Sequence, residues 1–202
     1  GLPGAMGHAG LLHMHVHVME MSPHPERALK SGDALYHTMP DSGHLRHMPT
    51  HIDVLCGNYQ AVVERNHAAI VADRKFVDRN GVFNFYSGYR AHDYHFKVYG
   101  AMFLGQYQPA IEAAEEMVST IPRELLEMGN PPIADWLEGY VPIKQHVLIR
   151  FGKWQEILDQ PLPDDPELYC VTTAMMRYTR AVAYSATNKV AEAEIERDAF
   201  MA

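Results

Sequence analysis

Apolar residues recur at helical spacing along most of the chain. Between residues 59 and 77 the apolar positions are three, four or seven residues apart: Ala61, Val62, Ala68, Ala69 and Val71. Residues 107–121 give an alanine-rich amphipathic helix that ends before Pro122, and residues 167–187 give a long run without glycine or proline. Strand-like alternation is limited to residues 13–19, whose flanks have a helical pattern. The pattern predicts an all-α protein.

Three stretches of the chain share one arrangement of residues: 51–69, 99–117 and 146–160. In each, an apolar helix ends at a glycine, and an aromatic residue follows two positions later: Gly57 and Tyr59, Gly105 and Tyr107, Gly152 and Trp154. Glycine permits a tight turn and close packing, as a helical hairpin requires. Residues 182–196 look like a degenerate fourth copy with Asn188 in the turn. The predicted hairpins are residues 10–38, 48–79, 91–121, 136–160 and 167–202.

One of these stretches carries a resemblance to a known family. Residues 103–117, FLGQYQPAIEAAEEM, resemble a tetratricopeptide repeat, with its leucine-glycine-x-tyrosine turn followed by alanines at helical spacing. The resemblance covers roughly residues 44–200 and implies a single domain, 1–202, of antiparallel helical hairpins stacked as a right-handed solenoid. The hairpin glycines are 48 and 47 residues apart, against about 34 in a standard repeat. Residues 75–92 and 122–136 are therefore expected to be extra segments between hairpins.

A narrower resemblance covers the first half of the chain. Residues 8–29 (HAGLLHMHVHVMEMSPHPERAL), 43–59 (GHLRHMPTHIDVLCGNY) and 92–96 (HDYHF) resemble a group of large bacterial and fungal tetratricopeptide-like proteins. These carry a histidine-rich first helix, a His-Met-Pro-Ser-His element and a later His-Asn/Asp-x-His pair. Here Thr50 stands at the serine position. The resemblance implies a fold and a shared site, and no particular reaction.

Composition narrows the function classes. Of the 202 residues, 47% are hydrophobic, enough for a sizeable core. No run of about 18 apolar residues predicts a membrane span, and no basic amphipathic helix predicts a membrane surface. The net charge of −8 argues against a nucleic-acid groove. Two cysteines exclude a disulfide scaffold and fit a cytoplasmic protein. The chain begins without methionine, and we interpret it as a fragment of a longer array or a processed chain.

Histidine is concentrated in the first half, where twelve of the 13 lie before residue 96. On a helix from about residue 10 to 21, His13, His17 and Glu20 lie at i, i+4 and i+7, on one face, while His15 points elsewhere. Two histidines at i and i+4 with a carboxylate one turn later form a spacing that suits a metal ion.

Two further elements carry histidine. Proline is best tolerated in the first turn of a helix, so we expect a helix to start at residue 48 or 49, with His51 in its first turn, His47 just before it and His44 in the preceding loop. His92 and His95 lie one turn apart beside Asp93, and His146 repeats the position of His51 in the third hairpin. If first helices line a concave surface, these elements face one cavity. The predicted metal-binding residues are His13, His17, Glu20, His44, His47, His51, His92 and His95.

Several interpretations remain open at this point. Imidazoles with one or two carboxylates suit zinc, iron or copper, and nickel or manganese as well, without distinguishing them. Glu20 and Asp93 are either ligands or acceptors that orient imidazole N–H groups. The aromatic residues from 83 to 99 either wall the cavity or, as we favour, pack in the core. Arg46, Arg90 and Lys97 either hold an anionic group or, as we favour, are surface charges.

The function hypotheses follow from the same residues. The leading hypothesis is a metal-binding protein with a polyhistidine site in its groove, either a binding protein or a metalloenzyme, an oxidoreductase or hydrolase acting on a small molecule. The alternative is an interaction scaffold that binds a peptide or partner in the groove without metal. For His24, His37 and His67 we favour ordinary packing or hydrogen bonding. The sequence has no P-loop, dinucleotide-binding or GxSxG motif.

Overall fold

The computed structural model describes residues 3–130 and 133–202, and every regular element in these ranges is a helix. The all-α prediction is confirmed. Pro131 and Pro132, which belong to the predicted segment 122–136, lie outside the described residues. The chain divides into two compact units, Gly1–Gln106 and Tyr107–Ala202. Among the described residues, no helix has both the length and the apolar composition needed to cross a bilayer.

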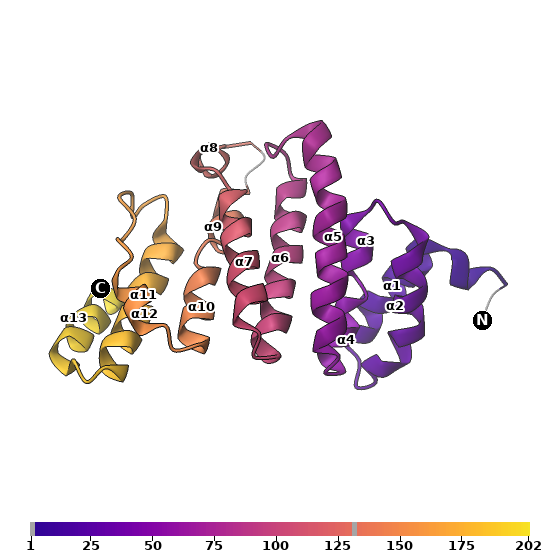
Figure 1. The fold of residues 1–202 in the computed structure, drawn as a ribbon. Helices are drawn as coiled ribbons and strands as arrows, with labels where there is room; N and C mark the ends of the chain where they lie inside the picture. The colour runs from indigo at the N-terminus through magenta and orange to yellow at the C-terminus, as the bar shows by residue number, and fades with distance from the viewer. Residues whose placement is uncertain (1–2, 131–132) are drawn as a thin grey trace. The chain divides into compact units, whose positions relative to one another are not determined.

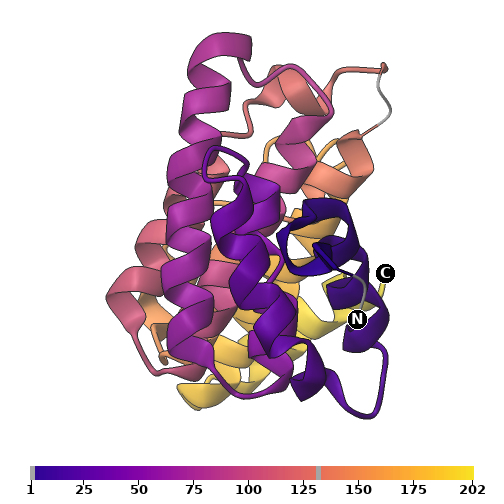
Figure 2. The same cartoon turned by 90° about the vertical axis from the view of Figure 1, so that its right-hand side faces the viewer.

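The first unit, coloured indigo to magenta in Figure 1, holds all the histidine elements discussed above except His146. Its elements in chain order are η1 (Ala5–Gly7), α1 (Ala9–Glu20), η2 (Pro25–Ala28), α2 (Leu29–Thr38), α3 (Gly43–His47), α4 (Thr50–Leu55), α5 (Tyr59–Asn80) and α6 (Tyr86–Phe103). The helix α1 packs on α2 and α4, whereas α3 packs on both α5 and α6. Figures 1 and 2 show the short helices α3 and α4 against the long helix α5.

A small apolar core holds α1 against its neighbours. Leu12 and Val16 of α1 are buried together with Leu35, Met48 and Ile52. Burial of side chains of this kind stabilises a fold by roughly 1.5–3 kcal/mol each. Because Leu12 and Val16 each precede a histidine, burying them fixes the side of α1 on which His13 and His17 lie.

The hairpin turns repeat one backbone geometry. Gly57, Gly105, Gly152 and Asn188 all have φ between 60° and 76°, in the left-handed region. At each turn the next residue donates its N–H to the carbonyl five positions earlier: Asn58 to Asp53, Gln106 to Ala101, Lys153 to Leu148 and Lys189 to Tyr184. This is the capping bond of a helix that ends in a left-handed residue. The turn glycines and the place of Asn188 in the fourth turn are confirmed.

The elements around the histidines differ from the predictions in two ways. His44 and His47 lie in α3, so the prediction of a loop before Pro49 is wrong. Pro49 caps α4, and His51 lies in its first turn as predicted. The segment 75–92 is also mostly helical, because α5 continues to Asn80, ends at Gly81 with φ 71°, and α6 starts at residue 86.

The second unit is a further set of helices. They are α7 (Tyr107–Ser119), α8 (Arg123–Leu126), α9 (Ala134–Glu138), α10 (Ile143–Arg150), α11 (Trp154–Leu158), α12 (Cys170–Ala186) and α13 (Val190–Met201). The buried Glu138 of α9 accepts hydrogen bonds from the backbone N–H groups of Val171 and Thr172 in the first turn of α12. A carboxylate is favoured there, because the N–H groups of the first turn have no partner within the helix. His146 lies on α10 and is exposed, outside the first unit.

Candidate metal centre

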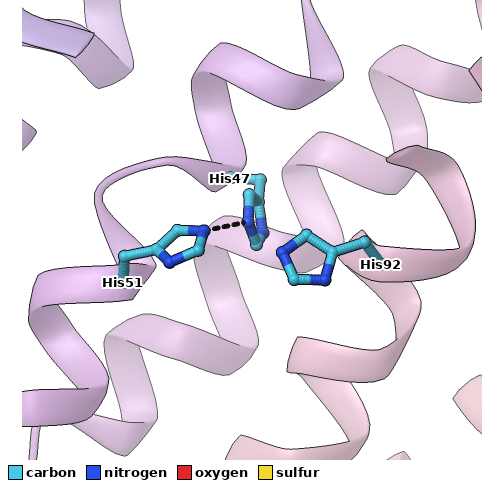
Figure 3. Close-up of side chains that lie close together, drawn as sticks. All are labelled: His47, His51 and His92. Atoms are coloured by element: carbon cyan, nitrogen blue, oxygen red, sulfur yellow. Dashed lines mark hydrogen bonds between the residues drawn. The ribbon is translucent and has the colours of Figure 1, made fainter. Parts of the chain in front are cut away.

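Three histidine rings converge in the first unit. His47 comes from α3, His51 from α4 and His92 from α6, and Figure 3 shows their rings pointing toward one another. One ring nitrogen from each lies within 4.8 Å of the others. The Nε2 atoms of His47 and His51 are only 2.9 Å apart. The His92 ring centroid lies 4.6 Å from that of His47 and 5.6 Å from that of His51.

The protonation of His47 is fixed by a buried amide. His47 has no exposed surface, and its Nδ1 lies 2.7 Å from Asn66 Oδ1. The Asn66 Nδ2 donates to the carbonyl of Val62 at 2.8 Å, which orients the amide with its oxygen toward His47. Since an amide oxygen only accepts, Nδ1 of His47 carries the hydrogen. In the neutral ring the Nε2 atom then presents a lone pair.

Glu20 fixes His51 in the same way. The Oε2 atom of Glu20 lies 2.7 Å from Nδ1 of His51, and a carboxylate accepts hydrogen bonds without donating any. In a neutral His51 ring the Nε2 atom therefore also presents a lone pair. The two Nε2 lone pairs of His47 and His51 face each other, and this contact is unfavourable unless a proton or a cation lies between them.

Burial disfavours protonation of these histidine rings. It lowers the pKa of His47 well below the usual value, and the neighbouring His51 and His92 lower it further. The pKa of His51 is lowered by burial as well, although the charge of Glu20 opposes that shift. His92 has its pKa lowered to about 3, first by burial and then by the neighbouring His51 and His95. The three rings are therefore neutral near pH 7, the form that binds metal.

A second group of histidines adjoins the first. His13 and His17 lie one turn apart on α1, with ring centroids 4.7 Å apart. The Nε2 of His13 lies 3.3 Å from the Nε2 of His44 on α3. His17 Nδ1 lies 3.0 Å from the Oε1 atom of Glu20, so each oxygen of Glu20 faces a different imidazole. Burial, followed by the neighbouring histidines, lowers the pKa of His44 to about 4.

Behind His47 lies a pair of buried carboxyl groups. Asp93 Oδ1 is 3.3 Å from His47 Nδ1, and neither side chain is exposed. Burial raises the pKa of Asp93 well above its usual value, and the neighbouring Asp73 raises it further. Burial also raises the pKa of Asp73, but the Tyr86 hydroxyl, which donates to it at 2.7 Å, and the charge of Arg90 oppose this. The side chains of Asp73 and Asp93 are hydrogen-bonded to each other, which requires one proton between the two carboxyl groups. We assign this shared proton to Asp93.

One aromatic residue, Phe96, packs against all three histidine rings. The Phe96 ring lies 4.7–4.8 Å from the rings of His47, His51 and His92. Among the other aromatic residues from 83 to 99, Tyr89 packs on His44, Tyr94 is buried, and Phe83 and Phe85 are more than half exposed. Phe96 and Tyr89 thus line the histidine cluster, whereas Tyr94 packs in the core.

The structure brings six of the predicted residues into one cluster: His13, His17, His44, His47, His51 and His92. Glu20 lies beside them as the acceptor for two imidazoles. His95, one turn after His92, is half-buried and lowers the pKa of His92 without joining the close group of three. His15 faces Ser31, as its separate orientation on α1 predicts.

The structure also tests the sequence interpretations of the arginines and of the remaining histidines. Arg90 is 2% exposed, so its interpretation as a surface charge is wrong. Arg46 donates to the Tyr36 hydroxyl at 2.7 Å and to the Pro40 carbonyl. The residues interpreted as ordinary packed histidines, His24, His37 and His67, are exposed and lie outside the cluster.

Two site residues on α5 are absent from the predicted set. Asn66 and Asp73 share the buried face of this helix with Val62 and Ala69, at spacings of three and four residues. Val71, predicted to belong to the apolar stripe, is 41% exposed. On the buried face of the helix, Asn66 faces His47 and Asp73 faces Tyr86. Polar residues in register with Val62 and Ala69 are the sequence signal that could have revealed them.

Comparisons with protein-family profiles, with curated proteins and with solved structures find no match for this chain. The case for a function therefore depends on the geometry of the histidine cluster.

Proposed function

We propose that this protein binds a transition-metal ion through His47, His51 and His92. The observation that carries the proposal is the 2.9 Å separation of the Nε2 atoms of His47 and His51, whose Nδ1 atoms both face acceptors. A metal ion replaces the lone-pair repulsion with two bonds. Metal–nitrogen bonds of about 2.0–2.1 Å at a tetrahedral angle separate two ligand nitrogens by about 3.4 Å. The two rings need to move apart by only a few tenths of an ångström.

The surroundings of the ligands support the proposal. Imidazoles that bind metal usually donate their second N–H to a carboxylate or carbonyl oxygen, as His51 does to Glu20 and His47 to Asn66. The alternative of a peptide-binding groove requires accessible histidines. His47 has no exposed surface, so a peptide in a groove cannot contact it.

The remaining parts of the proposal concern the fold and the chemistry. We propose that the hairpins stack as a tetratricopeptide-like solenoid, supported by the four turns that share one capping bond. Three histidines leave a coordination position free for water or a small molecule. A metal ion with such a position acidifies bound water or binds an oxidant, the chemistry of a hydrolase or an oxidoreductase.

Metal content tests the proposal. The full chain, purified without a histidine tag, is reconstituted with Zn²⁺ or Co²⁺, desalted and analysed for metal. We expect bound metal in the wild type and in the control His24→Gln, an exposed histidine, and loss in His51→Gln and His92→Gln. A chelator should lower the Tm of the wild type by several degrees, because a metal that binds only the native state stabilises it. Trace metal after reconstitution and no chelator effect would contradict the proposal.

A further inference from the structure

The six-histidine cluster contains a second pair of facing nitrogens. Nε2 of His13 and Nε2 of His44 lie 3.3 Å apart, and their rings are edge-on, with centroids 5.2 Å apart. This repeats the arrangement of His47 and His51, with helices α1 and α3 in place of α3 and α4. The separation is close to the value of about 3.4 Å for two nitrogens on one tetrahedral ion.

His17 is the third histidine of this second group, and its ring nitrogens do not meet those of His13 and His44 within the 4.8 Å that the nitrogens of the first group share. It lies one turn after His13 on α1, with ring centroids 4.7 Å apart. Its Nδ1 donates to Oε1 of Glu20 at 3.0 Å, so its Nε2 carries the lone pair in the neutral ring. Two histidines at i and i+4 joined by a third from another helix form a common metal-binding arrangement.

Glu20 connects the two groups. One of its oxygens faces His17 and the other faces His51, so a single carboxylate holds an imidazole of each group with Nε2 available for a metal. The groups are adjacent: the ring centroids of His17 and His51 are 5.8 Å apart, and those of His44 and His47 are 6.3 Å apart. If only one ion were bound, Glu20 would need to orient only one of these two imidazoles, His17 or His51.

We propose that the cluster holds two metal ions side by side, one on His47, His51 and His92 and a second on His13, His17 and His44. This inference rests on the proposed function of the first three histidines and adds a second ion to it. Two adjacent ions together bind a substrate that has two donor atoms, or a bridging hydroxide or oxygen species.

The second ion binds more weakly than the first. When Nε2 of His44 binds a metal, its hydrogen moves to Nδ1, which is buried and has no hydrogen-bond partner among the described residues. His47 and His51 have acceptors for that hydrogen. An unsatisfied buried donor weakens binding, and we expect the second equivalent to bind about 10- to 100-fold more weakly than the first.

A Co²⁺ titration of the full chain, followed by visible absorption and by metal analysis at saturation, tests the second ion. We expect two equivalents in the wild type with separated affinities, and one in His13→Gln with the affinity of the first retained. The control His15→Gln alters a histidine of the same helix that faces Ser31, and it should bind two. With Cu²⁺, two bound ions should broaden each other's paramagnetic resonance signal, and His13→Gln should give the signal of an isolated ion.

The outcomes separate the two proposals. One equivalent in both wild type and His13→Gln overturns the second ion and leaves the proposed function standing. Two equivalents in His13→Gln place the second ion elsewhere and also overturn the inference. No bound metal in the wild type overturns both proposals together.

Discussion

Glu20 on α1 accepts a hydrogen bond from His51 on α4, with 2.7 Å between Oε2 and Nδ1. The contact aims the Nε2 atom of His51 at that of His47, and the second oxygen of Glu20 orients His17. The carboxylate therefore acts on the cluster through imidazoles and is not one of the three closest potential ligands. Its removal should affect metal binding through the orientation and basicity of these rings.

Glu20→Gln is expected to weaken metal binding by about 10- to 100-fold, because partners that orient ligating histidines contribute on that scale. The glutamine can still accept one hydrogen bond, but it loses the negative charge that makes the imidazoles better ligands. A competition titration against a chelator of known affinity measures the change. Glu64→Gln, on the exposed side of α5, is the control and should bind as the wild type does. Equal affinities of both variants would contradict the role of Glu20.

Asn66 is expected to stabilise the metal-free protein by orienting His47. Asn66→Ala removes the acceptor at 2.7 Å and leaves a buried N–H without its partner, which costs about 1–3 kcal/mol of unfolding free energy. The matched control is Asn80→Ala on the same helix. Asn80 likewise donates to the carbonyl four residues earlier, but it is exposed. Urea unfolding in the presence of a chelator measures both, and a similar loss in the two variants would assign the effect to the helix alone.

Gly43→Ala is expected to displace α3 from α5. A Cβ atom at residue 43 would overlap with Asp73 Oδ1 and lie 2.9 Å from the backbone carbonyl of Ala69. Because the carbonyl belongs to the backbone of α5, the overlap is not relieved by rotating a side chain alone, and we expect a loss of about 1–3 kcal/mol. Gly7→Ala is the control, because a Cβ atom added at residue 7 would have no other atom within 4 Å. Unchanged urea midpoints in both variants would show that α3 tolerates the displacement.

Acidification is expected to destabilise the metal-free protein as the pH falls from about 6.5 towards 4. Burial lowers the pKa of His44 to about 4 and that of His92 to about 3, whereas an unfolded chain protonates histidine near pH 6.5. In that range the unfolded chain binds protons that the folded protein does not, so the free energy of unfolding decreases as the pH falls. The raised pKa values of Asp53, Asp73 and Asp93 act in the opposite direction. They are outnumbered by the histidines with a lowered pKa, which are His13, His44, His47, His51, His92 and His146.

This loss of stability on acidification is measured as Tm against pH in the presence of a chelator. His92→Gln removes one of the groups that titrate only in the unfolded chain, so its Tm should fall less steeply than that of the wild type. Parallel curves for the two proteins would contradict the assignment of a neutral, half-buried His92. His24→Gln, which removes an exposed histidine, should follow the wild type.

The sequence contained enough to predict that six of the seven candidate histidines meet, but not that His95 stays outside the close group, and it said less about what surrounds them. Helical spacing placed His13 and His17 on one face, and the turn glycines set the hairpins. Whether Glu20 is a ligand or an acceptor depends on its rotamer and on the position of α4, which no local pattern specifies. Asn66 and Asp73 were missed because a polar residue in a helix usually faces solvent. Their burial becomes understandable only once His47 of α3 and Asp93 of α6 are known to face α5.

The assignment of a proton to Asp93 leads to an asymmetry between the two buried carboxyl groups. Asp93→Asn places an amide N–H where the protonated acid donates to Asp73, and we expect a change in unfolding free energy of less than about 1 kcal/mol at pH 7. Asp73→Asn replaces the carboxylate that accepts from the Tyr86 hydroxyl and offsets the buried charge of Arg90, and a loss of about 3–5 kcal/mol is expected for a broken buried charge pair. Urea unfolding of both variants in chelator measures the difference. If Asp93→Asn were the more destabilising, Asp93 would be the ionised member, and the carboxyl beside His47 would carry a negative charge.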